Sequence, residues 1–347
     1  MRFAAVTVLG LSLSGSLFAV QAQAQSSPPP ATQVVVPPPP QDPLEKGSFN
    51  FVLENDLFYD RDRHYTNGVQ FSWTSARDDV PDWVREGAHS FPFFPPGGTV
   101  RASYALGQNM YTPADISLRD PPRDDRPYAG WLYGAVGLVA ENGVALDQVQ
   151  LALGMVGPAS LAEPAQKFVH NVIDSREPKG WNTQLHNEPG FILSYQHSQR
   201  AYVTETVLGL GFDLTPHVGG ALGNVLTYAN AGATIRVGQY LPNDYGPPRI
   251  QPTLPGSGFF EPRSTFGWYL FVGADGRAVG RNIFLDGNTF GDSRSVDKEL
   301  FVGDLQGGLA LTYGDARLTF TRVYRTREFK SQDDPDVFGS VSLSLRF

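Results

Sequence analysis

The sequence contains no cysteine, and this absence excludes disulfides, thiolate metal sites and thiolate nucleophiles. It also lacks an excess of positive charge: 27 lysines and arginines oppose 35 aspartates and glutamates, for a formal net charge of -8. An acidic chain without a basic run binds nucleic acid poorly, so no nucleic-acid partner is expected. After residue 24 there is no apolar run long enough for a transmembrane helix. Its 37 glycines and 14 tyrosines favour a β-barrel in an exported protein.

The first 24 residues have the pattern of a secretory signal peptide. Arg2 supplies the positive charge, residues 6–20 the apolar core, and residues 22–24 (Ala-Gln-Ala) a small-residue cleavage site. Removal of this segment takes away Arg2 and no acid, which moves the net charge from -8 to about -9. Residues 25–46 are rich in proline and have no periodicity, so we predict an extended, disordered leader. Residues 47–347 are then expected to form one domain.

The last eleven residues read as a strand of an outer-membrane barrel. Apolar and polar side chains alternate here: Val341, Leu343, Leu345 and Phe347 against Ser340, Ser342, Ser344 and Arg346. A strand between lipid and a wet lumen needs this alternation. The terminal phenylalanine also resembles the assembly signal of bacterial outer-membrane barrels. We therefore predict a location in the bacterial outer membrane.

Segments of alternating hydrophobicity, bounded by turn residues, recur along the domain. They lie near residues 48–56, 66–76, 101–112, 130–140, 145–156, 189–198, 201–212, 225–240, 265–280, 298–312, 315–327 and 337–347. The number is even, as a closed bacterial barrel requires. The predicted fold is all-β, a twelve-stranded antiparallel transmembrane β-barrel.

Residues 158–174 break this pattern with a helical spacing. The apolar positions are Leu161, Ala165, Phe168, Val169 and Val172, and the polar positions on the opposite side are Glu163, Gln166, His170 and Asp174. A helix in a barrel protein must avoid the lipid-facing wall, so it lies either in a loop or in the lumen. The pattern alone favours a helix with a solvated polar face.

Carboxylates, amides and hydroxyls gather where the first two predicted strands meet. The first strand stops on Glu54-Asn55-Asp56, and the second opens at Tyr65 and Thr66. Little apolar burial explains these residues. A polar, solvated turn is the plain interpretation, and a site is the alternative.

These residues carry a resemblance that runs through the chain after the leader. Residues 54–56 with 65–68 (Tyr-Thr-Asn-Gly) resemble the lipid A 3′-O-deacylase family of outer-membrane barrels. So do residues 107–113 (Gly-Gln-Asn-Met-Tyr-Thr-Pro), 125–130 (Asp-Arg-Pro-Tyr-Ala-Gly), 157–170 and 180–184 (Gly-Trp-Asn-Thr-Gln), in the same order. The resemblance implies a twelve-stranded barrel with a short α-helix in the lumen.

The resemblance also implies a reaction, which is Ca²⁺-dependent hydrolysis of the ester that joins the 3′ acyloxyacyl chain to lipid A. It makes His170 the base that activates water, and it adds Gln166, Asn55, Asp56 and Thr66 to the catalytic set. This chemistry is reasonable for these residue types. Neutral imidazole is well suited to take a proton from water near pH 7, and a hard cation prefers carboxylate and amide oxygens.

The chain departs from the family pattern at two positions. A family lysine falls near Leu118, and Arg119 beside it is our candidate for holding a lipid A phosphate. A family acid near the metal falls at Arg176, and Glu177 is the adjacent replacement. The expected calcium ligands are therefore Asp56, Asn55 and Glu177, and Asp60 and Asp62 are further candidates in the sequence. The expected partners are lipid A and outer-membrane lipids, and the protein is expected to be a monomer or weak dimer.

Two other functions compete with this one. The run His64-Tyr65-Thr66-Asn67 loosely resembles the site of an outer-membrane phospholipase, with a hydroxyl nucleophile activated by imidazole. Alternatively, the barrel is a non-catalytic porin or structural protein. A helix carrying His170 that plugs the lumen would argue against an open pore.

Overall fold

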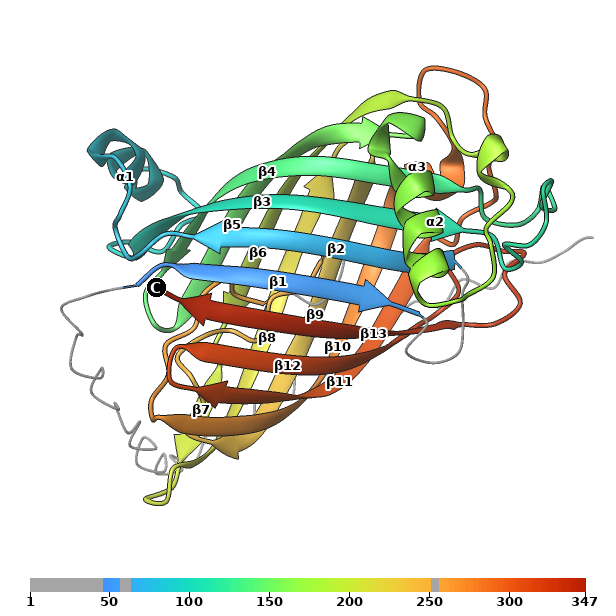
Figure 1. The fold of residues 1–347 in the computed structure, drawn as a ribbon. Coiled ribbons are helices and arrows are strands. Elements are labelled where there is room, and N and C mark those ends of the chain that lie inside the picture. The colour runs from blue at the N-terminus through green and yellow to red at the C-terminus, as the bar shows by residue number, and fades with distance from the viewer. Residues whose placement is uncertain (1–45, 57–63, 251–255) are drawn as a thin grey trace, which may run out of the picture. The chain divides into compact units, whose positions relative to one another are not determined.

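The computed structural model describes residues 46–56, 64–250 and 256–347. Strands dominate and form one curved sheet (Figure 1). The strands are β1 (Ser48–Asn55), β2 (His64–Thr74), β3 (Thr99–Thr112), β4 (Ala129–Glu141), β5 (Ala145–Val156), β6 (Glu188–Gln199), β7 (Tyr202–Glu205), β8 (Leu210–Leu222), β9 (Leu226–Gln239), β10 (Phe266–Asn282), β11 (Phe301–Tyr313), β12 (Ala316–Arg325) and β13 (Asp336–Arg346). The helices are α1 (Asp82–His89), α2 (Ala162–Val172) and α3 (Ile283–Asp286), with 3₁₀ turns at Pro158–Ser160 and Trp181–Thr183.

The sheet closes on itself. Strand β1 pairs with β2 on one side and with β13 on the other, from Ser48 opposite Arg346 to Asn55 opposite Gly339. On the far side of the ring β6 pairs with β8. Within the described residues twelve strands complete this antiparallel ring, and the short β7 only borders β8. The predicted twelve-stranded antiparallel barrel is confirmed.

One predicted strand was wrong in position. The segment 201–212 divides between the short β7 and the start of β8, and the ring strand continues to Leu222. Proline and glycine hid this strand, because Pro216 and the following glycines are typical of turns. In the structure Pro216 falls between the stretch that pairs with β7 and the stretch that pairs with β6. A missing backbone N–H is tolerated at such a break.

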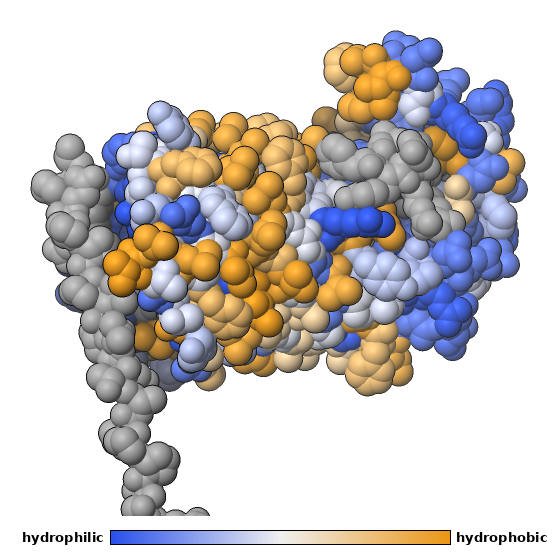
Figure 2. Space-filling model, turned by 90° about the horizontal axis from the view of Figure 1, so that it is seen from below, coloured by the Kyte–Doolittle hydropathy of each residue, from blue (hydrophilic) through white to orange (hydrophobic). Residues whose placement is uncertain are grey.

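The wall has an apolar outer face and a polar inner face. Along β10, Leu270 and Val272 on the outer face are 54% and 56% exposed, whereas Asp275 and Arg277 on the inner face are buried. Figure 2 shows the result as an apolar band along the wall, with hydrophilic residues gathered at one end of the barrel. An outer-membrane barrel presents such a band to lipid. No helix in the described part of the chain is long and apolar enough to cross a membrane.

The lumen is filled. From the end where β13 finishes, the chain between β9 and β10 enters it and buries Tyr245, Phe259 and Phe260. At the opposite end Phe284 of α3 stacks on Tyr111 with ring centroids 4.0 Å apart. Between them remains a cavity of about 100 Å³, lined mainly by amides, hydroxyls and one guanidinium, among them Gln70, Gln148, Gln150, Gln196, Ser194 and Arg249.

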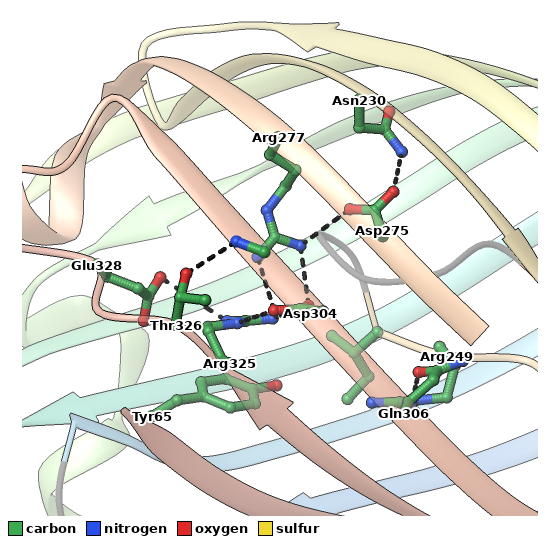
Figure 3. A network of polar contacts seen from close by, with 12 residues as sticks. Tyr65, Asn230, Arg249, Asp275, Arg277, Asp304, Gln306, Arg325, Thr326 and Glu328 are labelled. Atoms are coloured by element: carbon green, nitrogen blue, oxygen red, sulfur yellow. Dashed lines mark hydrogen bonds and ion pairs between the residues drawn. The ribbon is translucent and has the colours of Figure 1, made fainter. Parts of the chain in front are cut away.

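Buried ion pairs cross-link the inner wall (Figure 3). Asp304 of β11 accepts paired hydrogen bonds from Arg277 and from Arg325, at distances of 2.8 to 3.1 Å. Arg249 of the loop that enters the lumen binds Glu54 of β1 at 2.8 Å and Gln306 of β11 at 2.6 Å. Asp275 and Glu328 lie 3.5 Å and 3.8 Å from the guanidiniums of Arg277 and Arg325, so these buried positive charges have enough carboxylate partners for a stable barrel.

Helix α2 is not in the lumen, so that prediction is corrected. It lies against the outer face of the wall, over the ends of β3 and β4 (Figure 1). A Cβ atom at Gly130 of β4 would collide with Ser160 and with Ala162 of α2. Gln108 of β3 donates to the Ser160 carbonyl at 2.6 Å. The helix that does enter the lumen is the four-residue α3.

The orientation of α2 explains the error. Its polar side chains Gln166 and His170 are 2% and 3% exposed, whereas Phe168 and Val172 are 70% and 69% exposed. The helix is therefore reversed relative to one in a water-soluble protein: its polar side faces the wall and its apolar side faces outward. Where the outside is lipid, this reversal buries polar groups and leaves apolar ones in contact with acyl chains.

Candidate functional site

A row of residues on the outer face leads from β1 to α2. Asn55 lies opposite Asn67 of β2, Asn67 opposite Met110 of β3, and Met110 opposite Gly130 of β4. Adjacent strands are about 4.8 Å apart, so Asn55 lies roughly 10 Å from Met110 across the sheet. Gly130 lies directly under the first turn of α2. The polar cluster at the first hairpin and the helix thus occupy one side of the wall.

The first turn of α2 is packed firmly against this wall. Ala162 is 1% exposed and forms a buried cluster with Met110, Ile116, Tyr128 and Trp181. Gly130 provides the space because it has no side chain. The polar residues Gln166 and His170 follow one and two turns later on the side that faces the wall.

The imidazole of His170 has a defined tautomer. Its Nδ1 lies 2.5 Å from the backbone carbonyl oxygen of Arg176, in the segment that follows the helix. A carbonyl oxygen only accepts, so Nδ1 carries the proton and the lone pair of neutral imidazole is on Nε2. A histidine held in this way is prepared to act as a general base through Nε2.

Gln166 is fixed by a residue that the sequence analysis did not single out. The indole Nε1–H of Trp181 donates to Gln166 Oε1 at 2.7 Å. Among the described residues, the Nε2 group of Gln166 is buried and has no hydrogen-bond partner. Trp181 was visible only as part of the motif at 180–184, and its wholly buried side chain was not apparent from a local run that is otherwise polar.

The other catalytic candidates lie at the start of the second strand. The hydroxyl of Thr66 shares a hydrogen bond of 2.7 Å with that of Thr112 on β3, at a point where the pairing of β2 and β3 shifts register. Asp56 is 3% exposed, and its backbone N–H points to the Thr66 carbonyl at 3.5 Å. These contacts place Asp56 and Thr66 together, next to Asn55.

Arg119 and Glu177 lie in exposed loops on the same side as α2. The two loops are joined, because the Lys179 N–H donates to the Ile116 carbonyl at 2.9 Å. Asp115 of the first loop binds Ser117, and this hydrogen bond, aided by the charge of Arg176, lowers the pKa of its carboxyl. Arg119 and Glu177 therefore lie in two loops that are bonded to each other beside α2.

The geometry disagrees with the phospholipase interpretation. His64 Nδ1 lies 2.7 Å from Asp336, and its Nε2 lies 3.7 Å from Asp125. The His64 ring packs edge-on against Phe329 at 5.3 Å. These ion pairs lead away from Thr66, whose hydroxyl binds Thr112 instead. His64 therefore links the start of β2 to Asp336 at the start of β13 and to Asp125 of the loop before β4. It does not form the pairing of imidazole and hydroxyl that the phospholipase interpretation requires.

The described residues fit a hard cation only in part. They contain no group of three or more histidine, cysteine, aspartate or glutamate side chains that could hold a metal ion. Asp56 and the adjacent Asn55 are nevertheless oxygen donors of the type that calcium prefers. Asp60 and Asp62, the further candidates, lie outside the described residues.

Comparisons with known proteins agree with this architecture. The model of the family described as outer membrane protein LpxR matches residues 9–347. Among solved structures the chain is similar to LpxR from Salmonella typhimurium, with 18% identity and a TM-score of 0.70, over 86% of this chain and 100% of that chain. At that identity the likeness establishes the fold.

Other likenesses are weaker. The β domain of the Bordetella autotransporter BrkA covers 87% of this chain and 98% of its own, at 10% identity, but its TM-score of 0.41 is too low to support an argument. The curated proteins give no match. The match over nearly the whole chain and the closed barrel make this an outer-membrane protein, and the chain belongs to the family of outer membrane protein LpxR.

Proposed function

We propose that the protein hydrolyses the ester that links the 3′ acyloxyacyl chain to lipid A in the outer membrane. The observation that carries the proposal is the position of His170, buried with Gln166 between α2 and the outer wall. A site outside the barrel, under a helix whose free side is apolar, is reached from the membrane. Family membership supports the same reaction.

In the proposed mechanism His170 Nε2 takes a proton from water as the water oxygen adds to the ester carbonyl. The bond between Nδ1–H and the Arg176 carbonyl holds the ring and stabilises the imidazolium that forms. The tetrahedral intermediate then breaks its bond to the sugar oxygen, which receives the proton from His170. The products are a free fatty acid and a lipid A hydroxyl.

Calcium is part of the proposal. Asp56 and Asn55 would hold it, with Glu177 a third candidate from the loop that follows α2. Bound there, the cation supplies positive charge for the oxygen that becomes negative during hydrolysis. Thr66, held by Thr112, maintains the start of β2 beside Asp56.

Substrate binding follows from the surfaces around the site. The exposed apolar side chains of α2 and of the wall below it suit acyl chains, so we assign the α2 end of the barrel to the leaflet that contains lipid A. Arg119, exposed in the loop between β3 and β4, is proposed to bind a phosphate. We retain the monomer or weak dimer as the proposed oligomeric state.

The test is mass spectrometry of lipid A after incubation with the purified, folded protein and Ca²⁺. The expected result is loss of the mass of the 3′ acyloxyacyl chain, with release of the corresponding fatty acid. Unchanged lipid A together with hydrolysed phospholipid would favour the phospholipase. No change in either lipid would favour a porin, although loop and aromatic side chains fill the described lumen.

A further inference from the structure

Trp181 is placed by packing that leaves it little freedom. Its side chain is 1% exposed, and its ring lies against Tyr128 with centroids 4.9 Å apart. Tyr128 in turn donates its hydroxyl to the Ile116 carbonyl at 3.2 Å. Gly180 lets the chain approach, because a Cβ there would lie 2.5 Å from the Tyr128 ring and 2.9 Å from the Leu118 carbonyl. The indole ring is therefore held in one position beside α2.

The rigid indole decides which way the Gln166 amide faces. An indole N–H can only donate, so the Gln166 atom that it contacts at 2.7 Å must be the amide oxygen. The amide is planar, and its N–H₂ group therefore points to the other side. That group is buried and has no hydrogen-bond partner in the described part of the chain.

A buried donor of this kind points to a ligand. Buried polar groups in proteins are almost always hydrogen-bonded, because an unpaired one destabilises the fold. Gln166 precedes His170 by one helical turn, on the side of α2 that faces the wall. An acceptor bound beside His170 would satisfy the Gln166 donor, and the ester carbonyl oxygen is such an acceptor.

We propose that Trp181 is a positioning residue that holds the Gln166 amide so that its N–H₂ group donates to the ester carbonyl oxygen of the substrate. The bond to this oxygen strengthens as negative charge develops on it during water addition. A carbonyl oxygen has two lone pairs, so a bond from Gln166 is compatible with a nearby cation. This role deepens the proposed deacylase function and rests on it.

The first test replaces Gln166 by glutamate. A carboxylate still accepts the hydrogen bond from the Trp181 N–H but has no N–H₂ group to donate. Gln166→Glu therefore keeps the bond to Trp181 and removes only the proposed bond to the substrate. We expect kcat for lipid A deacylation to fall about 10²-fold at pH 8, with KM changed less than about threefold. A protonated carboxyl regains an O–H donor, so the activity of the variant relative to wild type should rise as the pH is lowered.

The second test is a double-variant cycle. We expect Trp181→Phe to lower kcat about tenfold in the wild-type background and less than about twofold in the Gln166→Ala background, because both changes remove one interaction. If Trp181→Phe fails to fold, a benzothienylalanine at position 181 keeps the ring shape and removes only the N–H. The same replacement at Trp268, on the far side of the barrel in β10, is the control.

The outcomes are distinct. Equal losses from Trp181→Phe in both backgrounds, or full activity of Gln166→Glu at pH 8, would overturn the positioning role while the deacylase function stands. Absence of deacylation by the wild-type protein would instead remove the proposed function on which this role rests.

Discussion

His170 is the residue on which the proposed reaction depends. Its Nδ1 is engaged by the Arg176 carbonyl, so Nε2 is the atom that acts on water. We predict that His170→Ala folds normally and loses about 10² to 10⁴-fold in ester hydrolysis, the usual loss on removal of a general base. Heat-modifiable migration checks the fold, and released fatty acid measures the rate. His186→Ala, which changes an exposed histidine at the same end of the barrel, is the control and should stay active.

The carboxylate of Asp56 is the proposed anchor for calcium. It is 3% exposed beside Thr66, whereas Asp60 lies outside the described residues. We predict that activity disappears on exhaustive chelation and returns with Ca²⁺. Asp56→Ala should raise the calcium concentration needed for half-maximal activity more than Asp60→Ala does. Full turnover in excess chelator would remove calcium from the mechanism.

Asp125 gives the loops a dependence on pH. Burial raises the pKa of its carboxyl. The contact with His64 and the hydrogen bond from the Ala114 N–H lower the pKa by more than burial raises it, so the pKa lies below its ordinary value. A lowered pKa adds stability above the unfolded value of about 3.9, and this stability is lost as the pH falls through the folded value. We therefore predict that Asp125→Asn is less stable than wild type at pH 7 and that the difference shrinks below about pH 4. Thermal unfolding in detergent across this range measures it, and a constant difference would contradict the assignment.

At the scale of elements, the contact between α2 and β4 positions the site. Gly130 leaves room for Ser160 and Ala162, and any side chain there would push the helix away from the wall. We predict that Gly130→Val keeps the barrel but lowers deacylation at least tenfold, because His170 and Gln166 move with the helix.

Gly134 offers a matched control for this change. It lies four residues further along β4 on the same face, and a Cβ there meets only the Ala105 carbonyl, at 4.0 Å. Gly134→Val should therefore leave both folding and activity unchanged. Equal losses from the two variants would indicate an effect on the strand rather than on the docking of α2.

At the scale of the whole molecule, ion pairs in the lumen link the neighbouring strands β10, β11 and β12 through their side chains (Figure 3). Asp304 lies between Arg277 and Arg325 and is 3% exposed. We predict that Asp304→Asn removes the shortest ion pairs of two buried guanidiniums, which keep the longer contacts to Asp275 and Glu328. This change should lower the free energy of unfolding by about 3–5 kcal/mol. Asp297→Asn breaks an exposed pair with Lys330 and should cost less than about 1 kcal/mol. Urea unfolding of both variants compares the two effects.

The sequence by itself determined the barrel. A period of two residues places one class of side chain on each face, and twelve such segments with an outward apolar face leave a closed antiparallel sheet as the stable solution. The pattern was weakest at β8, where proline and glycine interrupted it, and there the predicted strand was displaced. The residues of the candidate site came from ordered motifs, and their roles await the experiments above.

Only the tertiary structure decided where the helix lies. A helical period shows that residues 158–174 have two faces, but it does not show whether the polar face meets water, the lumen or the outer wall. The space at Gly130 and the bond from Gln108 to Ser160 settle this, and both depend on strands that precede the helix by about 30 to 50 residues. The tautomer of His170 and the orientation of the Gln166 amide are likewise set by partners 6 and 15 residues away. Such contacts form only when the loop folds back on the barrel, so no local pattern encodes them.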